Sequence, residues 1–331
     1  MMKHSNISIF VPHFGCKNMC SFCNQLHITG ERQKPSAKTV IDAVNVAMES
    51  PRFNSENAEI AFFGGSFTAI DRDYQNELLS AAFQFVKSGA VKGIRISTRP
   101  DAIDEEILEN LKSFGVTSID LGAQSMDDEV LKLNLRGHNS DAVYEASRLI
   151  KDYGFSLGLQ MMTGLYGDTD EKSFRTAVKI AEIKPQTVRI YPTIVLKNTY
   201  LEKLFNEGKY KPQSISEASS LCGKLLDFFQ KEEINVIRLG LHSIEEDSFV
   251  AGPWHPAFGE MCESARYLNL AYKILENQPK GIYNLIVKTS EISKMVGQHK
   301  SNIEKLKEKG YVCSVSGDSQ MDKLKIIIKS R

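Results

Sequence analysis

The chain has 331 residues, of which 42% are hydrophobic and 25% are charged, a composition that suits a globular protein with a sizeable core. Its 41 basic residues balance its 41 acidic residues, so net charge gives no global attraction to nucleic acid or to a membrane surface. The length suggests one large domain and a smaller one.

The N-terminus leads directly into an apolar run, Ile7 to Val11, without the long apolar core of a secretion signal. No stretch approaches the uninterrupted apolar length of a membrane span, so we expect a cytoplasmic protein with no membrane partner. Three of the six cysteines fall within eight residues, and the other three are scattered, which does not fit a secreted disulfide framework.

Short apolar runs alternate with amphipathic helix patterns from residue 7 to about residue 240, as in folds built from parallel β/α units. The expected strands lie near residues 7–11, 59–63, 93–97, 117–121, 156–161, 187–191 and 235–239. Between them, apolar residues at helical spacing predict helix faces packed on the sheet, one set being Phe174, Val178 and Ala181. Ligands of such folds bind at the carboxyl ends of the strands, where this chain has its unusual loops.

The pattern changes toward the C-terminus, which predicts three domains at residues 1–245, 246–280 and 281–331. The middle domain is a helical extension, with a helix from about Glu260 to Glu276. The last is a small α+β module of order β-α-α-β-β, with strands near 283–288, 311–316 and 323–329. From Lys280 onward there are eleven basic and five acidic residues, so positive charge is concentrated at this end.

A cysteine loop directly follows the first expected strand, with Cys16, Cys20 and Cys23 spaced Cys-x-x-x-Cys-x-x-Cys. Thiolates select iron-sulfur clusters or zinc. Three of them can hold three irons of a 4Fe-4S cubane and leave the fourth iron open. With His27 as a fourth ligand, the same cysteines could instead make a structural zinc site, and the loop alone leaves both alternatives open.

Four more motifs follow the cysteine loop in order along the chain. They are Gly64-Gly65 after the second expected strand, Gln124-Ser125 after the fourth, Arg136-Gly137-His138, and a Gly-Leu-x-Gly-x-Thr loop starting at Gly164. In this combination the sequence resembles the radical S-adenosylmethionine (radical SAM) superfamily over roughly its first 245 residues. The resemblance implies an α/β fold, a partial open parallel barrel of the (β/α)6 type, followed here by the small C-terminal module.

The resemblance also implies a set of site residues. Cys16, Cys20 and Cys23 would be the metal ligands of the 4Fe-4S cluster, and S-adenosyl-L-methionine would chelate the fourth iron. The residues implied to bind that cofactor are Phe22 near the adenine, Gly64 and Gly65 at the methionine amino group, and Gln124 and Arg136. Ser97 and Gln160 stand where relatives often carry a carboxylate, and as polar side chains both are expected to hydrogen-bond cofactor hydroxyls.

The chemistry that the resemblance implies is reductive cleavage of S-adenosyl-L-methionine, followed by hydrogen abstraction from a substrate. The cofactor carries the difficult chemistry, while the protein orients it and excludes competing reactions. A reductant such as flavodoxin or ferredoxin is the expected electron-donating partner. Because an open iron reacts with oxygen, the enzyme should be oxygen-sensitive.

Two further runs of sequence concern the substrate. The segment from Val188 to Thr199 and the run Thr98-Arg99-Pro100-Asp101 resemble the catalytic subunit of Elongator, which modifies the wobble uridine of tRNA. The first two cysteines are closer together than in Elongator, and a chain ending at Arg331 has no counterpart of its acetyltransferase domain. The cysteine spacing agrees instead with oxygen-independent coproporphyrinogen oxidases, which makes a tetrapyrrole-like small molecule the alternative substrate.

The C-terminal module contains a segment, Val296 to Ile303, that resembles the Gly-x-x-Gly loop with which KH domains clamp single-stranded nucleic acid. Lys300 replaces the second glycine, which hinders close backbone approach but adds a positive charge near phosphates. This KH-like module predicts binding of RNA, and of tRNA in particular, through residues 281–331. The alternative is a capping module with a solvated lysine face.

Three functions follow from these observations. The leading hypothesis is a radical SAM enzyme that acts on RNA. The second is a radical SAM enzyme that acts on a small molecule such as a tetrapyrrole, and the third is a non-enzymatic, zinc-containing RNA-binding protein.

Overall fold

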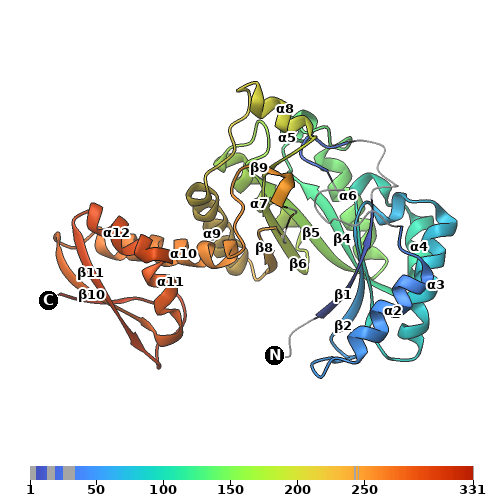
Figure 1. Cartoon of the computed structure of the whole chain (residues 1–331), viewed down its shortest axis with the longest axis horizontal. Coiled ribbons are helices and arrows are strands. Elements are labelled where there is room, and N and C mark those ends of the chain that lie inside the picture. The colour runs from blue at the N-terminus through green and yellow to red at the C-terminus, as the bar shows by residue number, and fades with distance from the viewer. Residues whose placement is uncertain (1–4, 13–18, 25–33, 242–243, 245, 331) are drawn as a thin grey trace.

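A computed structural model describes residues 5–12, 19–24, 34–241, 244 and 246–330 of the chain. The main body is a parallel sheet that curls into a half-barrel, confirming the predicted partial open barrel (Figure 1). Its strand order is β1-β2-β3-β4-β5-β6-β8, and each strand pairs in parallel with its neighbours. The strands are β1 (Ser5–Val11), β2 (Ala58–Gly64), β3 (Gly93–Thr98), β4 (Val116–Gln124), β5 (Ser156–Thr163), β6 (Thr187–Pro192) and β8 (Asn235–Leu239).

Helices follow the strands and begin at well-defined capping residues. The side chains of Ser36, Asp71, Asp104, Asp127, Asn139, Thr169, Thr199 and Ser214 each accept a hydrogen bond from the first turn of the helix that they precede. These helices are α2 (Ala37–Met48), α3 (Arg72–Lys87), α4 (Glu105–Ser113), α5 (Asp128–Leu133), α6 (Ser140–Asp152), α7 (Asp170–Ile183), α8 (Tyr200–Asn206) and α9 (Ile215–Lys231). Most of these caps end strand-to-helix loops, whereas Asn139 and Ser214 end the connections from α5 to α6 and from α8 to α9.

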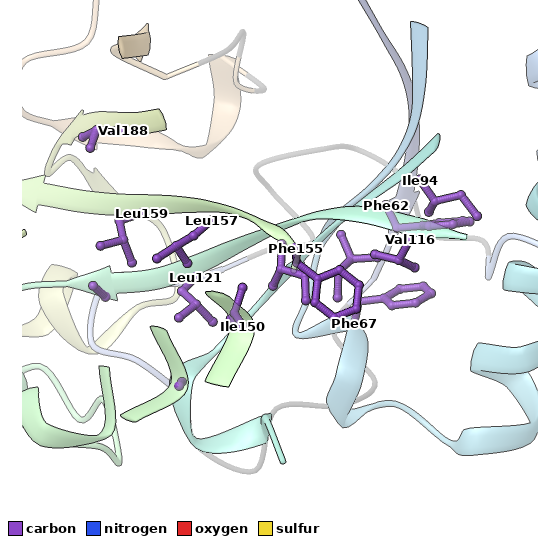
Figure 2. Close-up of a cluster of buried hydrophobic side chains, with 14 of the residues drawn as sticks. Phe62, Phe67, Ile94, Val116, Leu121, Ile150, Phe155, Leu157, Leu159 and Val188 are labelled. Carbon is purple, nitrogen blue, oxygen red and sulfur yellow. The ribbon is translucent and has the colours of Figure 1, made fainter. Parts of the chain in front are cut away.

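The main core lies between the outer face of the sheet and these helices. Alternate residues of the strands point outward, and Figure 2 shows Phe62, Ile94, Leu121 and Leu157 among them. The Phe62 ring stacks on Phe67, with 4.7 Å between ring centroids. Burial of each such side chain contributes roughly 1.5–3 kcal/mol relative to its exposure to water.

The helix face predicted at Phe174, Val178 and Ala181 is correct only at its last position. Phe174 and Val178 are 38% and 37% exposed, whereas Ala181 is buried. Smaller and β-branched neighbours on α7 face the sheet instead, among them Ala177 and Ile180. The Phe174 ring lies 5.2 Å from that of Phe228, so it packs sideways on α9 rather than on the sheet.

A second, smaller sheet forms the C-terminal module, in the predicted order β-α-α-β-β (Figure 1). Its central strand pairs in parallel with one neighbour and antiparallel with the other. Its elements are β10 (Gly281–Lys288), α11 (Ile292–Val296), α12 (Ser301–Glu308), β11 (Tyr311–Asp318) and β12 (Ile327–Ser330). The last strand starts later than the predicted residue 323.

Helix α10 (Phe258–Leu275) leads from the half-barrel to this module, as Figure 1 shows. Its first turns place Phe258 and Cys262 in the main core. Farther along, Tyr267, Ala271 and Leu275 belong to the core of the module. The helix thus serves both cores, and the predicted domain limits near residues 245 and 280 stay a prediction.

Two short strands, β7 (Val195–Leu196) and β9 (Phe249–Ala251), form an antiparallel ribbon near the carboxyl end of the half-barrel. Among the described residues, no helix combines the length and the apolar character that crossing a membrane requires.

Candidate active site at the carboxyl ends of the strands

The cysteine loop lies at the carboxyl end of the half-barrel. Cys16 and His27 lie outside the described residues, whereas Cys20 and Cys23 lie on one turn, in which the Cys23 amide donates to the Cys20 carbonyl at 3.1 Å. Ser21, between them, is fixed by Asn134: its amide donates to the Asn134 carbonyl at 3.1 Å and its hydroxyl to the Asn134 side-chain oxygen at 2.7 Å. The loop is therefore held by the segment that follows α5.

Arg136 joins the cysteine loop to the end of β4. Its Nη1 donates to the Cys20 sulfur at 3.0 Å, and its Nη2 donates to the Gly122 carbonyl at 2.6 Å. Its Nε is buried and has no hydrogen-bond partner in the described part of the chain. Two predicted site residues, Cys20 and Arg136, are thus in direct contact, and one charged donor of Arg136 remains for a ligand.

The diglycine lies at the carboxyl end of β2. Gly64 has φ = +112°, and a Cβ at that position would come within 2.5 Å of the Val11 carbonyl and would also collide with the Phe10 ring. Only glycine fits there without a shift of the first strand. The Gly65 amide donates to the Val11 carbonyl at 2.9 Å, so the diglycine ties the end of β2 to the strand from which the cysteine loop starts.

Two glutamines pair across neighbouring strands. The Gln160 amide nitrogen donates to the Gln124 side-chain oxygen at 3.1 Å. Gln124 has φ = +64° and ends β4 at an irregularity in the β4–β5 register, which turns its side chain toward Gly122 and Arg136. Ser97 lies one strand away, level with Asp120, and no hydrogen bond joins it to another predicted site residue among the described ones.

Phe22 forms an apolar wall next to the cysteines. It packs against Met162 and Leu165 at the end of β5, in a cluster that Tyr191 of β6 also contacts. It also packs against a second cluster that includes Leu201 and Tyr210. Phe22 thus joins the two apolar clusters.

Arg99 supports Arg136 from behind, a role that its sequence motif did not indicate. Its Nη2 donates to the Arg136 carbonyl at 2.7 Å, and its Nε pairs with the Asp101 carboxylate. The adjacent Thr98 hydroxyl lies 2.5 Å from that of Thr68, in the loop after β2. The run Thr98-Arg99-Pro100-Asp101 therefore clamps three strand-end loops together.

His138 stands close to the same two arginines. Burial, reinforced by the charge of Arg136, lowers the pKa of its imidazole to about 4, so the ring is neutral near pH 7. In the tautomer that donates from Nδ1 to the Asn139 carbonyl at 3.2 Å, Nε2 is an acceptor, and it has no partner within the described residues.

A buried ion network fills the inner face of the sheet below the strand ends. Arg95 binds Glu59 at 2.9 Å and Asp120 at 2.8 Å, and Arg189 binds the other oxygen of Asp120 at 3.0 Å. The side chains of Glu59, Arg95, Asp120 and Arg189 are only 4%, 7%, 5% and 11% exposed. Gly158 leaves room for the Asp120 carboxylate, because a Cβ there would collide with it.

Sequence reasoning missed Asn134, Arg99 and the ion network. The network could have been predicted, because Glu59 and Arg95 are charged residues within otherwise apolar strands and such residues are rarely buried without a partner. Asn134 carried no such signal, because its role depends on Ser21, 113 residues earlier in the chain. Within the described ranges no three His, Cys, Asp or Glu side chains gather into a metal site; Cys16, the third ligand of the predicted triad, is outside them.

The loop between α11 and α12 is a second candidate site. His299 and Lys300 have φ values of +51° and +62°, and both side chains are exposed. The loop is anchored behind them by Asn302, whose buried amide donates to the carbonyls of Ser264 and Met295 at 2.9 and 3.1 Å. The exposed residues are thus held in a defined conformation against α10.

Comparison with known proteins gives two matches to family descriptions. Residues 10–177 match the Radical SAM superfamily, and residues 185–269 match the Radical_SAM C-terminal domain. Together they cover the half-barrel and most of α10.

Curated relatives also match the chain. A tRNA uridine(34) acetyltransferase of Dehalococcoides mccartyi is 25% identical over 239 residues, which are 62% of this chain and 52% of that protein. Elongator complex protein 3 of Homo sapiens is 29% identical over 191 residues, 52% of this chain and 35% of that protein. The chain therefore spans about a third to a half of the length of these relatives.

Among solved structures, an archaeal Elp3 of Methanocaldococcus infernus superposes with a TM-score of 0.65 at 21% identity, over 83% of this chain and 63% of that one. At this identity the likeness concerns the fold.

Proposed function

The chain belongs to the radical SAM superfamily of enzymes, and from this membership we propose that it cleaves S-adenosyl-L-methionine reductively at a 4Fe-4S cluster and removes hydrogen from an RNA, namely a tRNA. The relative named as a tRNA uridine(34) acetyltransferase supports the choice of tRNA. A flavodoxin or ferredoxin is the proposed electron donor.

The contact between Arg136, Cys20 and Gly122 is the observation that carries the proposal. It binds Cys20 to the end of β4, so the described sulfurs of Cys20 and Cys23, the diglycine and the glutamine pair all lie at the carboxyl ends of the strands. Thiol sulfurs with a cationic hydrogen-bond donor beside them fit an anionic iron-sulfur cluster. Cys16, Cys20 and Cys23 would hold it.

The remaining site residues fit the organic cofactor. The Arg136 Nε, which has no partner among the described residues, would donate to the cofactor carboxylate, because a guanidinium forms strong, charge-assisted bonds to carboxylates. Gly64 and Gly65 would lie against its amino group, and Gln124 would bind beside Arg136. Ser97 and Gln160 would take hydroxyl groups. Phe22 would cover the adenine.

When bound, the cluster and the cofactor would supply one-electron chemistry and hydrogen abstraction. The chain's own part is to orient and to shield. Phe22, Met162 and Leu165 form an apolar wall on one side, and in the ion network below Asp120 pairs with both Arg95 and Arg189. Arg136 orients the cysteine loop and the cofactor together.

The C-terminal module would bind the RNA strand at its KH-like loop. Lys300 and His299 are exposed, and consecutive left-handed residues store backbone strain of the kind that is retained at functional sites. The basic excess from Lys280 onward favours a polyanion.

Anaerobic reconstitution with iron and sulfide tests the proposal. We expect a 4Fe-4S absorption and EPR spectrum, 5′-deoxyadenosine after reduction, and deuterium transfer into it from deuterated tRNA. Cys20→Ala should abolish the product, whereas Cys313→Ala, a buried thiol of the module, should retain it. Zinc without 5′-deoxyadenosine would instead support the zinc-protein alternative, and deuterium transfer from a tetrapyrrole but not from RNA would support the small-molecule alternative.

A further inference from the structure

A cavity of about 780 Å³ lies at the carboxyl end of β5, outside the site described above. Three segments line it: the β5–α7 loop (164–170), the α8–α9 connection (209–213) and the first turns of α9. Its volume suits a small ligand such as a mononucleotide.

The cavity shares a wall with the candidate active site. Leu165 lines the cavity and also belongs to the apolar cluster that holds Phe22. The rings of Tyr166 and Tyr210 meet edge to face in this wall, with 6.3 Å between centroids, and the Tyr210 hydroxyl donates to the Gly164 carbonyl at 2.7 Å. A ligand in the cavity would therefore lie one layer of side chains from the cysteine loop.

Two buried oxygens in the lining have no hydrogen-bond partner among the residues that the structure describes, Asp168 Oδ1 and Gln213 Oε1. The other Asp168 oxygen accepts from the Gly164 amide at 3.0 Å and from the Ser173 hydroxyl at 2.6 Å. A buried acceptor without a donor costs free energy, so the site favours a ligand that brings hydrogen-bond donors.

Positive charge borders the cavity on two sides. Lys211 lies in its lining and makes no ion pair within the described ranges. From the C-terminal module, Lys305 of α12 donates to the hydroxyl of Ser216, another lining residue, at 3.1 Å. The cavity thus lies between the apolar wall of the candidate active site and the KH-like module. The lining also holds the carboxylates of Asp168, Asp170 and Glu217 beside the ammonium groups of Lys209 and Lys211, so it fits a ligand that carries both hydrogen-bond donors and a phosphate.

We propose that this cavity binds a guanine nucleotide of the RNA strand that runs from the KH-like loop to the active site. The inference rests on the proposed function. Guanine offers two adjacent donors on one edge, N1–H and the 2-amino group, for the two unpaired oxygens of Asp168 and Gln213. The two tyrosines give its ring apolar contact, and Lys211 faces the phosphate.

The test is calorimetric titration of the full chain with GMP and with IMP, which differ only in the 2-amino group. We expect GMP to bind about tenfold more tightly, as the loss of one hydrogen bond to a buried acceptor predicts. Asp168→Asn places an amide NH₂ where the unpaired oxygen lies and should abolish the preference for GMP. Asp42→Asn, an exposed carboxylate on α2, is the control and should keep it. Thermal unfolding checks that both variants are folded.

Equal affinity for the two nucleotides, or no binding of either, overturns the inference, and so does a GMP preference that survives Asp168→Asn. Reductive formation of 5′-deoxyadenosine in the same preparation separates the two proposals. If it forms while GMP does not bind, only the guanine site fails; if GMP binds while it does not form, only the proposed function fails.

Discussion

At the residue scale, the site depends on side chains that touch no proposed cofactor. Arg99 holds the carbonyl of Arg136 at 2.7 Å, and Arg136 in turn donates to the Cys20 sulfur. Residues behind metal ligands commonly change metal or ligand affinity by about 10-fold to 100-fold when they are replaced. Arg99 is therefore a positioning residue, and its replacement should disturb the site without removing any predicted ligand.

Replacing Arg99 by methionine should weaken binding of S-adenosyl-L-methionine to the reconstituted protein by about tenfold and alter the EPR line shape of the cluster. Arg99→Lys, which keeps the charge and one donor, should restore part of the affinity. Arg72→Ala, which removes a surface pair with the 86% exposed Glu106 and a 3.3 Å bond to Gln75, both away from the cysteine loop, is the matched control. An unchanged affinity and spectrum in Arg99→Met would remove the positioning role.

Asp168 should make stability depend on pH in a definite direction. Burial raises the pKa of its carboxyl to about 6, although its bonds from Ser173 and Gly164 and the charge of Lys172 oppose the shift. The folded state therefore holds this proton more tightly than the unfolded state does. The resulting stability is fully present below the unfolded pKa, near 3.8, and is lost as pH rises through about 6.

Asp168→Asn lacks this titration, so its melting temperature relative to the wild type should rise between pH 4 and pH 6.5 and then level off. Differential scanning calorimetry across that range measures the difference. A difference that stays constant with pH would show that the carboxyl titrates alike in both states.

At the element scale, relief of backbone strain in the KH-like loop should raise the stability of the module but weaken its binding of RNA. The left-handed conformation of Lys300 at φ = +62° costs roughly 1–2 kcal/mol of folding free energy. Glycine would remove this strain, but its greater chain entropy in the unfolded state would offset part of the gain in stability. Lys300→Gly should therefore raise the free energy of unfolding by about 0.5–1 kcal/mol. It should also weaken RNA binding and lower the salt dependence of binding by about 0.7 in log–log slope, one phosphate contact on a single strand.

His299→Gly is the matched control for this pair of effects, because it relieves comparable strain at φ = +51° and removes no lysine. It should stabilise the module and leave the salt dependence of RNA binding as in the wild type. If Lys300→Gly binds RNA as the wild type does, with the same salt slope, the loop does not contact phosphate.

The elements were largely predictable because their signals are local. All seven strands of the main sheet occur where the apolar runs predicted them, including the run at 235–239. The face of α7 was wrong at Phe174 and Val178, since hydrophobic spacing says which residues share a face but not whether sheet or helix lies opposite. The candidate site was also predictable only where its signals are local. Its motifs lie in single loops and could be found in the sequence, whereas the contacts of Asn134 with Ser21 and of Arg99 with Arg136 exist only in the folded chain.

At the scale of the whole molecule, the ion network couples four strands, β2, β3, β4 and β6. Asp120 is its centre, because it pairs with both Arg95 and Arg189. Asp120→Asn would leave two buried guanidinium groups without a full counter-charge, and breaking a buried pair in this way costs about 3–5 kcal/mol. Urea unfolding should show this loss, while Glu106→Gln on the surface should change stability by less than about 1 kcal/mol. A loss below about 1 kcal/mol in Asp120→Asn would mean that water or another anion compensates.

Helix α10 determines how this protein can be divided in the laboratory. Phe258 and Cys262 of this helix face the core of the half-barrel, and three later residues face the core of the module, namely Tyr267, Ala271 and Leu275. Truncation of the chain before β10 would expose these three residues to solvent. A shortened chain ending near residue 280 should aggregate for that reason alone, whatever the module binds. A functional graft of the KH-like module onto another protein would therefore have to carry α10 with it.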